Sequence, residues 1–377
     1  MSDQSRICVF SLRDAFASVP RCCGYEFEDV IREIDAVDMV CPTLEPRPVT
    51  GLLEKVTRRL RRRTGWSIER EPKVVPPTVS HEYDLGFFIQ QDLGDADVLE
   101  LSPEWHDRCR VTVCLIEELW AHQTIWPKTL APLAKFDYLC VYCSGTAEAL
   151  AKATGRPVFY LAPGVDTLRF CPYPDPPERF IDLYSMGRRA EAAHRASYAL
   201  AQAGDIHYLY DSAGVRDVPS AAEHRALLAE RVKRTRYFVA NKAKVDAPED
   251  TQGQDEVGFR FFEGAAGGAI LIGDLPNCET FRTLLDWDAV AFQLDYASDD
   301  IAGLLREMDG QPERIAQARR ASVLHSLRRH DWVYRWETVL AKAGLPPLAA
   351  AQERKDSLEN RAKMVEAAPL TFDPQRP

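Results

Sequence analysis

Hydrophobic positions along the chain follow two alternating patterns. Short runs that are apolar on both faces, as in buried parallel strands, alternate with segments whose apolar residues recur at helical spacing. In the first half, strands are expected at 6–12, 37–42, 83–90, 110–118, 138–144 and 158–164, and helices at 25–35, 52–65 and 146–155. Strand-helix alternation of this kind predicts a parallel, doubly wound sheet.

A proline-dense stretch interrupts this pattern between 163 and 178. Pro163, Pro172, Pro174, Pro176 and Pro177 cannot lie inside a helix or a central strand. Beyond it the alternation restarts, with strands expected at 180–187, 205–211, 236–242, 269–274 and 289–294. Helices are expected at 188–204, 221–235, 299–310 and 312–344, and a loop leading into a helix at 258–268. The prolines therefore mark a linker between two α/β units.

The length supports the same division, because 377 residues exceed one ordinary hydrophobic core. We predict an α/β protein of two Rossmann-like lobes facing each other across a cleft. The expected boundaries are 1–165 for the first lobe, 166–178 for the linker, 179–345 for the second lobe and 346–377 for a tail.

Net charge narrows the choice of partners. The chain carries a formal charge of -10, which repels nucleic acid and anionic membranes, so no nucleic-acid partner is expected. One basic run, Lys55 and Arg58 to Arg63, is typical of a solvated helix face; a peripheral membrane contact is the alternative interpretation. The sequence shows neither an apolar run that would span a bilayer nor a secretory signal, which predicts a cytoplasmic protein.

The ten cysteines and eight histidines show no metal-binding spacing. Cys140 and Cys143 form a C-x-x-C, but they fall in an expected strand, where residues three apart face opposite ways. Buried reduced thiols are therefore expected. His325 and His330 are five apart and do not share a helix face. We predict neither a metal ion nor a cofactor.

Candidate binding residues were sought directly after strands, because ligands of parallel α/β sheets bind at the carboxyl ends of the strands. Gly187, Arg188 and Arg189 follow the expected strand 180–187 and precede a helix. Glycine permits close approach, the helix N-terminus attracts an anion, and arginine binds phosphate oxygens in a bidentate manner. These three residues predict a diphosphate contact. Asn241, which ends the expected strand 236–242, belongs to the same predicted donor site.

Glu263 is the second candidate. It lies among Phe261, Phe262, Ala265 and Ala266, where an unpaired carboxylate would be costly. A carboxylate can accept hydrogen bonds from two hydroxyls, which suits the vicinal diol of a ribose. The neighbouring Arg260 is placed in the same donor-binding set.

First-lobe candidates follow strands as well. His122, after the strand 110–118, suits a contact with a sugar or a general base, and a packing role is equally compatible. Of Glu117 and Glu118, one is expected to be structural and the other to face the cleft, and we place Glu118 among the catalytic candidates. Asp14, in the loop after the first strand, is the third; turn or capping roles are common for such residues.

Three segments resemble one family. Residues 160–172 resemble the linker of the group 1, family 4-like glycosyltransferases of GT-B fold, 260–273 resemble their donor-ribose helix, and 322–340 resemble their C-terminal helix. The resemblance covers roughly 80–345 and is nearest to the spore-maturation-type branch.

The resemblance implies metal-independent transfer of a sugar from a UDP, GDP or dTDP type of nucleotide-sugar. The acceptor hydroxyl would belong to a glycan, a lipid-linked molecule or a small molecule, and retention of configuration is favoured by analogy. Glu263 matches the ribose-binding glutamate, Arg188 or Arg189 matches the residue that holds the diphosphate, and His122 matches a first-lobe histidine near the donor sugar. The tail is expected to cross back to the first lobe.

The sequence departs from the family pattern at two points. Asp255, with Glu256 beside it, stands where the family commonly has a glutamate eight positions before the ribose glutamate. The family's lysine after the glycine-arginine pair is missing, and Arg189 is its candidate substitute.

Three rival readings stay open: a nucleotide-sugar epimerase, a phosphorylase, and a non-catalytic nucleotide- or carbohydrate-binding protein of the same fold. No pyridoxal-type lysine motif is present, which argues against a phosphorylase. A nicotinamide site would require G-x-G-x-x-G after the first strand, and the chain has R-D-A-F-A-S there.

Overall fold

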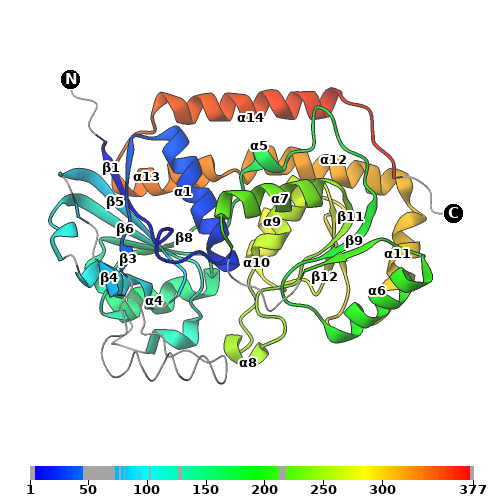
Figure 1. The fold of residues 1–377 in the computed structure, drawn as a ribbon, viewed down its shortest axis with the longest axis horizontal. Coiled ribbons are helices and arrows are strands. Elements are labelled where there is room, and N and C mark those ends of the chain that lie inside the picture. Colours follow the sequence, from blue (N-terminus) through cyan, green and yellow to red (C-terminus); the bar gives the residue numbers. More distant parts are fainter. Residues whose placement is uncertain are drawn as a thin grey trace, which may run out of the picture.

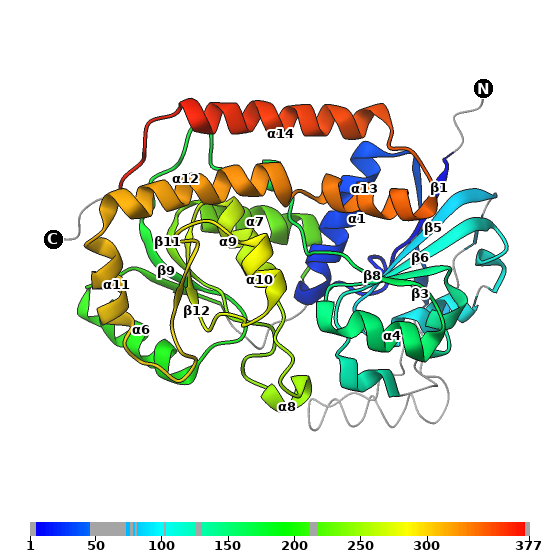
Figure 2. The ribbon, with the colours of Figure 1, turned by 180° about the vertical axis from the view of Figure 1, so that it is seen from behind.

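The computed structural model describes residues 5–45, 73–75, 78–79, 81–92, 94–101, 103–125, 130–211 and 218–373. It shows two α/β lobes side by side, joined by long helices that run along one side of the molecule (Figure 1, and from behind in Figure 2). The fold class predicted from the sequence is confirmed. The basic run Lys55 to Arg63 lies outside the described residues.

The first lobe is built on a six-stranded parallel sheet of order β2-β1-β5-β6-β7-β8. Its strands are β1 (Ile7–Phe10), β2 (Val37–Val40), β5 (Tyr83–Gln90), β6 (Cys109–Ile116), β7 (Tyr138–Val141) and β8 (Val158–Tyr160). A separate antiparallel pair joins β3 (Thr43–Glu45) and β4 (Lys73–Val75). The helices are α1 (Cys22–Ile34) and α4 (Ala147–Thr154).

The second lobe holds a five-stranded parallel sheet of order β10-β9-β11-β12-β13. Its strands are β9 (Ile181–Ser185), β10 (Tyr208–Tyr210), β11 (Thr235–Val239), β12 (Ile270–Gly273) and β13 (Ala291–Gln293). Its helices are α6 (Glu191–Ala203), α7 (Ala221–Lys233), α8 (Pro248–Thr251), α9 (Phe259–Ala266), α10 (Glu279–Leu284), α11 (Ile301–Asp309) and α12 (Pro312–Arg329).

The helices end and begin at the capping residues that the sequence predicts. Gly155 after α4 and Gly204 after α6 adopt left-handed conformations, with φ of 69° and 83°. Glycine makes that conformation at little cost, so both helices stop where the pattern predicts. At the start of α7, the Ser220 side chain accepts a hydrogen bond from the backbone N–H of Glu223.

The chain crosses between the lobes more than once. The proline-rich linker contains a short helix, α5 (Thr167–Phe170). The helical region expected over 312–344 is instead two helices, because α12 ends at Arg329 and α13 (Trp332–Ala343) starts after Asp331. Asp331 caps α13 by accepting from the backbone N–H of Val333.

Helix α13 packs in the core of the first lobe, although the sequence placed residues up to 345 in the second lobe. The Trp332 ring stacks on Phe27 of α1 with ring centroids 4.6 Å apart, and Trp336 lies edge-on to Phe87 of β5 at 5.4 Å. The chain therefore returns to the first lobe at residue 331, because these two tryptophans complete that lobe's core.

The last helix, α14 (Ala349–Ala367), then runs back over both lobes along α12 (Figure 1). It also contacts α1. Beyond it, the Asp373 carboxylate pairs with Arg236 at 2.9 Å and with Arg319 at 2.6 Å, both in the second lobe. The tail thus touches the first lobe but ends on the second. Among the described helices, none combines the length and apolar character needed to cross a membrane.

Candidate functional site

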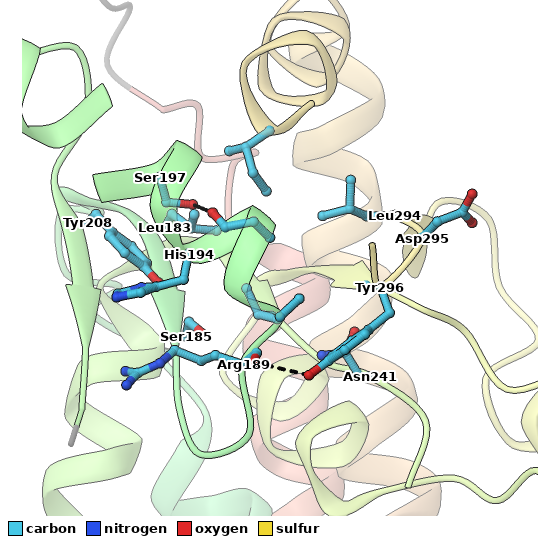
Figure 3. Close-up of a pocket in the computed structure, with 15 residues that line it drawn as sticks. Leu183, Ser185, Arg189, His194, Ser197, Tyr208, Asn241, Leu294, Asp295 and Tyr296 are labelled. Carbon is cyan, nitrogen blue, oxygen red and sulfur yellow. Dashed lines mark hydrogen bonds between the residues drawn. The ribbon is translucent and has the colours of Figure 1, made fainter. Parts of the chain in front are cut away.

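A small pocket lies at the carboxyl ends of the second-lobe strands (Figure 3). The order of that sheet reverses between β9 and β11, which is where open α/β sheets bind ligands. The residues that line it at this edge are Ser185 at the end of β9, Arg189, Asn241 after β11, Gly273 at the end of β12 and Tyr296 after β13. The pocket therefore occupies the position that the sheet topology favours for a ligand.

Gly273 lines this pocket, and Gly187 lies in the turn between two of its lining residues, Ser185 and Arg189. Gly187 has a φ of 81°, and its backbone N–H donates to Asp211 at 3.0 Å. A Cβ at Gly273 would lie 2.2 Å from the carbonyl oxygen of Ala240, so only glycine lets β12 end so close to β11. The Asn241 side-chain oxygen is used locally, because it accepts from the backbone N–H of Asp274 at 2.8 Å.

The predicted arginines lie beside this edge. Arg189 donates to the carbonyl oxygen of Asp211, and its guanidinium lies 5.2 Å from the centre of the Tyr210 ring. The Tyr296 hydroxyl donates to the carbonyl oxygen of Arg189 at 3.0 Å (Figure 3). Arg188 is half exposed and pairs with Asp246 at 2.7 Å.

The start of α6 adds a second feature suited to an anion. Its N-cap residue, Ala190, offers no side-chain hydrogen bond to the first turn. The first N–H groups of a helix have no partner within the helix, so this end attracts negative charge. Ala190, Ala193 and His194 of this turn line the pocket. Arginine and helix terminus together suit a phosphate group.

Glu263 is paired with arginines inside the protein. Its side chain is fully buried in α9, and its two carboxylate oxygens accept from Arg225 and Arg260 respectively. Burial alone would raise the pKa of this carboxyl, but the charges of Arg260 and Arg225 hold it at about 2. The ribose contact stays a prediction, and in this arrangement both oxygens already have partners.

The same network ties the lobes together. Arg225 of α7 also donates to Glu26 of α1 at 2.8 Å. Glu26 accepts in addition from the Trp332 indole N–H at 3.0 Å and from the backbone N–H of Asp166 at 2.9 Å. A buried chain of alternating charges, from Glu26 to Arg225 to Glu263, therefore runs across the interface between the two lobes.

Asp255 and Glu256 take separate roles. Asp255 stays in the second lobe, where it pairs with Lys242 at 3.2 Å and accepts from the backbone N–H of Asn277 at 3.0 Å. Glu256 reaches the first lobe and accepts from the backbone N–H groups of Ser144 at 2.9 Å and Gly145 at 2.8 Å. The residue beside the expected carboxylate is thus a bridge between lobes.

The first-lobe candidates do not form one cluster. Glu118 pairs with Lys244 of the second lobe at 2.9 Å. His122 lies in a 3₁₀ turn, and its Nδ1 is buried without a hydrogen-bond partner in the described part of the chain. Asp14 is exposed in the turn after β1, whereas Glu118 and His122 follow β6, and β5 lies between those strands.

Two further residues lie at this first-lobe edge, and the sequence reasoning singled out only one of them, Glu117. Glu117 directly follows β6, and Tyr142 directly follows β7. Both are buried, and the Glu117 Oε1 and Tyr142 hydroxyl have no hydrogen-bond partner among the described residues. Glu117 had been left undecided between two roles. Its position immediately after a strand was the available signal, but its burial depends on the packing of α1.

Within the described residues, no group of three or more histidine, cysteine or acidic side chains is arranged to hold a metal ion.

Part of the chain matches a known protein family. Residues 222–341 match the model of the family described as glycosyl transferase-like. The chain carries a glycosyl transferase-like domain. A domain of this class indicates a transferase. The matched region spans α7 to α13. Asn241, Asp255, Arg260 and Glu263 lie inside this region, and Gly187 to Arg189 lie before it.

Solved structures match this chain at low sequence identity. A glycosyltransferase from Rickettsia africae ESF-5 is 10% identical, with a TM-score of 0.50, over 90% of this chain and 98% of that chain. The glycotransferase of kitacinnamycin is 12% identical, with a TM-score of 0.39, over 91% and 100%. A ugt transferase from Siraitia grosvenorii in complex with UDP is 8% identical, with a TM-score of 0.37, over 90% and 99%. A search of curated proteins finds no match.

Proposed function

We propose that this protein transfers a sugar from a nucleotide-sugar to an acceptor hydroxyl at the interface of its two lobes. The observation that carries the proposal is the pocket at the β9–β11 switch point, where Arg189 and the uncapped start of α6 meet within a glycosyl transferase-like chain. The donor class is a UDP, GDP or dTDP sugar.

The donor diphosphate would lie against Gly187 and the first turn of α6. Gly187 leaves the backbone open to close approach, and nothing within 4 Å would meet a Cβ there. Arg188 is half exposed, so it can exchange Asp246 for a phosphate oxygen. These cations and N–H groups stabilise the charge that develops on the leaving phosphate, which is the role that a metal ion plays elsewhere.

The nucleoside would extend into the pocket beyond Ser185, towards Asn241 and Tyr296. A ribose contact by Glu263 requires Arg260 to turn away, because the Glu263 carboxylate now accepts from Arg260 and Arg225. Arg260 is the partner more able to move, since its side chain is 25% exposed whereas that of Arg225 is 2% exposed. Asp255 would approach the sugar only after leaving Lys242.

The acceptor would bind on the first lobe, where Asp14, Glu118 and His122 remain candidates. Lys244 to Glu118 and Glu256 to Ser144 already hold the two edges together. Closure of this kind excludes water and so limits hydrolysis of the donor. Retention of configuration and membership of the spore-maturation-type branch are part of the proposal, and the acceptor is a glycan, a lipid-linked molecule or a small molecule.

Arg189 provides the sharpest test of the donor site. Calorimetric titration with UDP, GDP, dTDP, ADP and CMP in EDTA should show one nucleoside diphosphate binding the wild type. Arg189→Ala should weaken that nucleotide about tenfold to a hundredfold, because a charge-assisted hydrogen bond contributes about 1.5–3 kcal/mol.

Arg195→Ala is the matched control, since Arg195 lies on the same helix with a side chain 73% exposed. It should bind the nucleotide as the wild type does. Binding by no nucleotide, or equal affinity of the Arg189 variant and the wild type, would refute the donor site described above.

A further inference from the structure

Glu117 and Tyr142 lie side by side at the carboxyl edge of the first-lobe sheet. Ile116 of β6 pairs with Val141 of β7, so the two residues that follow face each other across adjacent strands. The backbone N–H of Tyr142 donates to the carbonyl oxygen of Ile116 at 3.2 Å. Tyr142 packs in the core cluster that includes Leu115 and Phe27, and is therefore on the face covered by α1.

Both side chains carry polar atoms that nothing in the described part of the chain satisfies. Glu117 is 8% exposed and Tyr142 is 4% exposed. The Glu117 Oε1 and the Tyr142 hydroxyl oxygen are buried without a hydrogen-bond partner among those residues. A buried polar group without a partner destabilises a fold, and such groups are uncommon unless a ligand or water completes them.

A glycine of α1 leaves space for the carboxyl. A Cβ at Gly24 would lie 2.9 Å from the Glu117 Oε1 and 3.3 Å from Ile89, so a larger residue would press on the unpaired oxygen. The absence of a side chain at Gly24 therefore lets α1 pack beside this oxygen without pressing on it.

The pair also lies where the two lobes meet. The Tyr142 ring is edge-on to Phe259 of α9 in the second lobe, with centroids 5.2 Å apart. Cys23, the neighbour of Gly24, lies with its Sγ 3.5 Å from Glu263. The two unsatisfied groups are therefore close to the second-lobe helix that begins next to the predicted donor residues.

We propose that Glu117 and Tyr142 receive the reacting hydroxyl of the acceptor, with Glu117 taking its proton. This inference rests on the function proposed above. It assigns the proton-accepting role to Glu117 in place of Asp14, Glu118 or His122. An ionised carboxylate and a phenol hydroxyl favour an uncharged hydroxyl, such as that of a sugar, over an anionic group.

The acceptor O–H bond breaks and its proton passes to the Glu117 carboxylate. The acceptor oxygen forms a bond to the anomeric carbon on the face that the diphosphate leaves, which retains the configuration, and the bond from that carbon to the diphosphate oxygen breaks. Its electron pair leaves with the nucleoside diphosphate, whose charge is met by Arg188, Arg189 and the start of α6. The Tyr142 hydroxyl orients the acceptor oxygen without changing its own protonation.

The ionisation of Glu117 makes this step sensitive to pH. Burial raises the pKa of Glu117 to about 8, which Arg21 opposes and the carboxylates of Asp95, Glu28 and Asp92 reinforce. The other titratable groups that interact with Glu117 are Cys23 and Tyr25 of α1 and Tyr142 itself. A proton acceptor must be ionised, so the rate should rise with pH through about 8.

Stability should change in the opposite direction. The folded state holds the Glu117 proton more tightly than the unfolded chain between pH 4.5 and about 8. Protonation therefore favours the folded state, and stability attributable to this group falls as pH rises through that window. Glu117→Gln removes this loss, so the variant should already melt at a higher temperature than the wild type at pH 6, and the difference should be larger at pH 9.

The test measures sugar transfer and melting temperature of the same proteins between pH 6 and 9. UDP-glucose, GDP-mannose and dTDP-glucose serve as donors and are scored by release of the nucleoside diphosphate. Glu117→Gln should lose transfer at least a hundredfold, and should lose the rise in rate with pH, while nucleotide affinity is retained. Tyr142→Phe should lose transfer about tenfold and keep the pH profile.

Glu148→Gln, at an exposed position on α4, is the control and should match the wild type in every readout. Transfer by Glu117→Gln at the wild-type rate, or a clear drop in the melting temperature of both variants at pH 6, would overturn the inference and identify the pair as structural. A wild type that binds no nucleotide and turns over no donor would instead overturn the proposed function itself.

Discussion

At the scale of single residues, the surroundings of a side chain decide its role more than its type. Glu263 was chosen from the sequence because an unpaired carboxylate among phenylalanines and alanines is costly. The structure shows how that cost is met, by arginines from α7 and from its own helix. The sequence does indicate that the Glu263 carboxylate needs a partner that pairs with it. It does not identify Arg225, since that pairing depends on how α7 packs against α9.

Arg225→Met tests this buried chain of charges. The change leaves Glu26 and Glu263 without their shared cation, and an uncompensated buried charge destabilises a protein by about 3–5 kcal/mol. Urea unfolding should show a loss of that size. Arg195→Met, an equal change at an exposed position, should alter stability by less than about 0.5 kcal/mol. Similar stabilities of the two variants would show that the network contributes little.

At the scale of elements, the hydrophobic pattern located nearly all the strands. The strand β5 coincides with the expected 83–90, and Gly155 and Gly204 end helices where predicted. The region 312–344 was expected to be helical throughout, because neither glycine nor proline marks a break. The break comes at Asp331, whose side chain caps α13 and also accepts from the Thr167 backbone N–H at 3.0 Å. That second contact comes from a distant segment, so local pattern could not reveal it.

Trp332 tests how α13 is held on the first lobe. It stacks on Phe27 and donates to Glu26, and a Cβ at Gly164 would lie 2.6 Å from its ring. Trp332→Ala should destabilise the protein by about 3–5 kcal/mol, as expected for a large buried aromatic side chain. Tyr198→Ala, at an aromatic position that is 44% exposed on α6, should change stability far less. Denaturant unfolding compares the two, and equal losses would contradict the assigned crossing.

At the scale of the whole molecule, two parallel sheets present their carboxyl edges to each other. The alternation of strands and helices, the proline-rich linker and the glycine-arginine pair after β9 sufficed to predict two lobes and to place a candidate donor site. The contacts between lobes were beyond the sequence, because Glu256 to Ser144 and Lys244 to Glu118 join positions far apart along the chain. Those contacts determine which carboxylates are already paired and which could still act on a substrate.

Turnover of nucleotide-sugars would decide whether this protein is a metal-independent glycosyltransferase. Wild-type protein is incubated with UDP-, GDP- and dTDP-sugars and with glycan, lipid and small-molecule extracts as acceptors, in EDTA and in magnesium. We expect the protein to release one nucleoside diphosphate and to transfer its sugar, at a rate that EDTA does not change. Nucleotide binding without turnover of any donor, or turnover only with magnesium, would contradict a metal-independent glycosyltransferase.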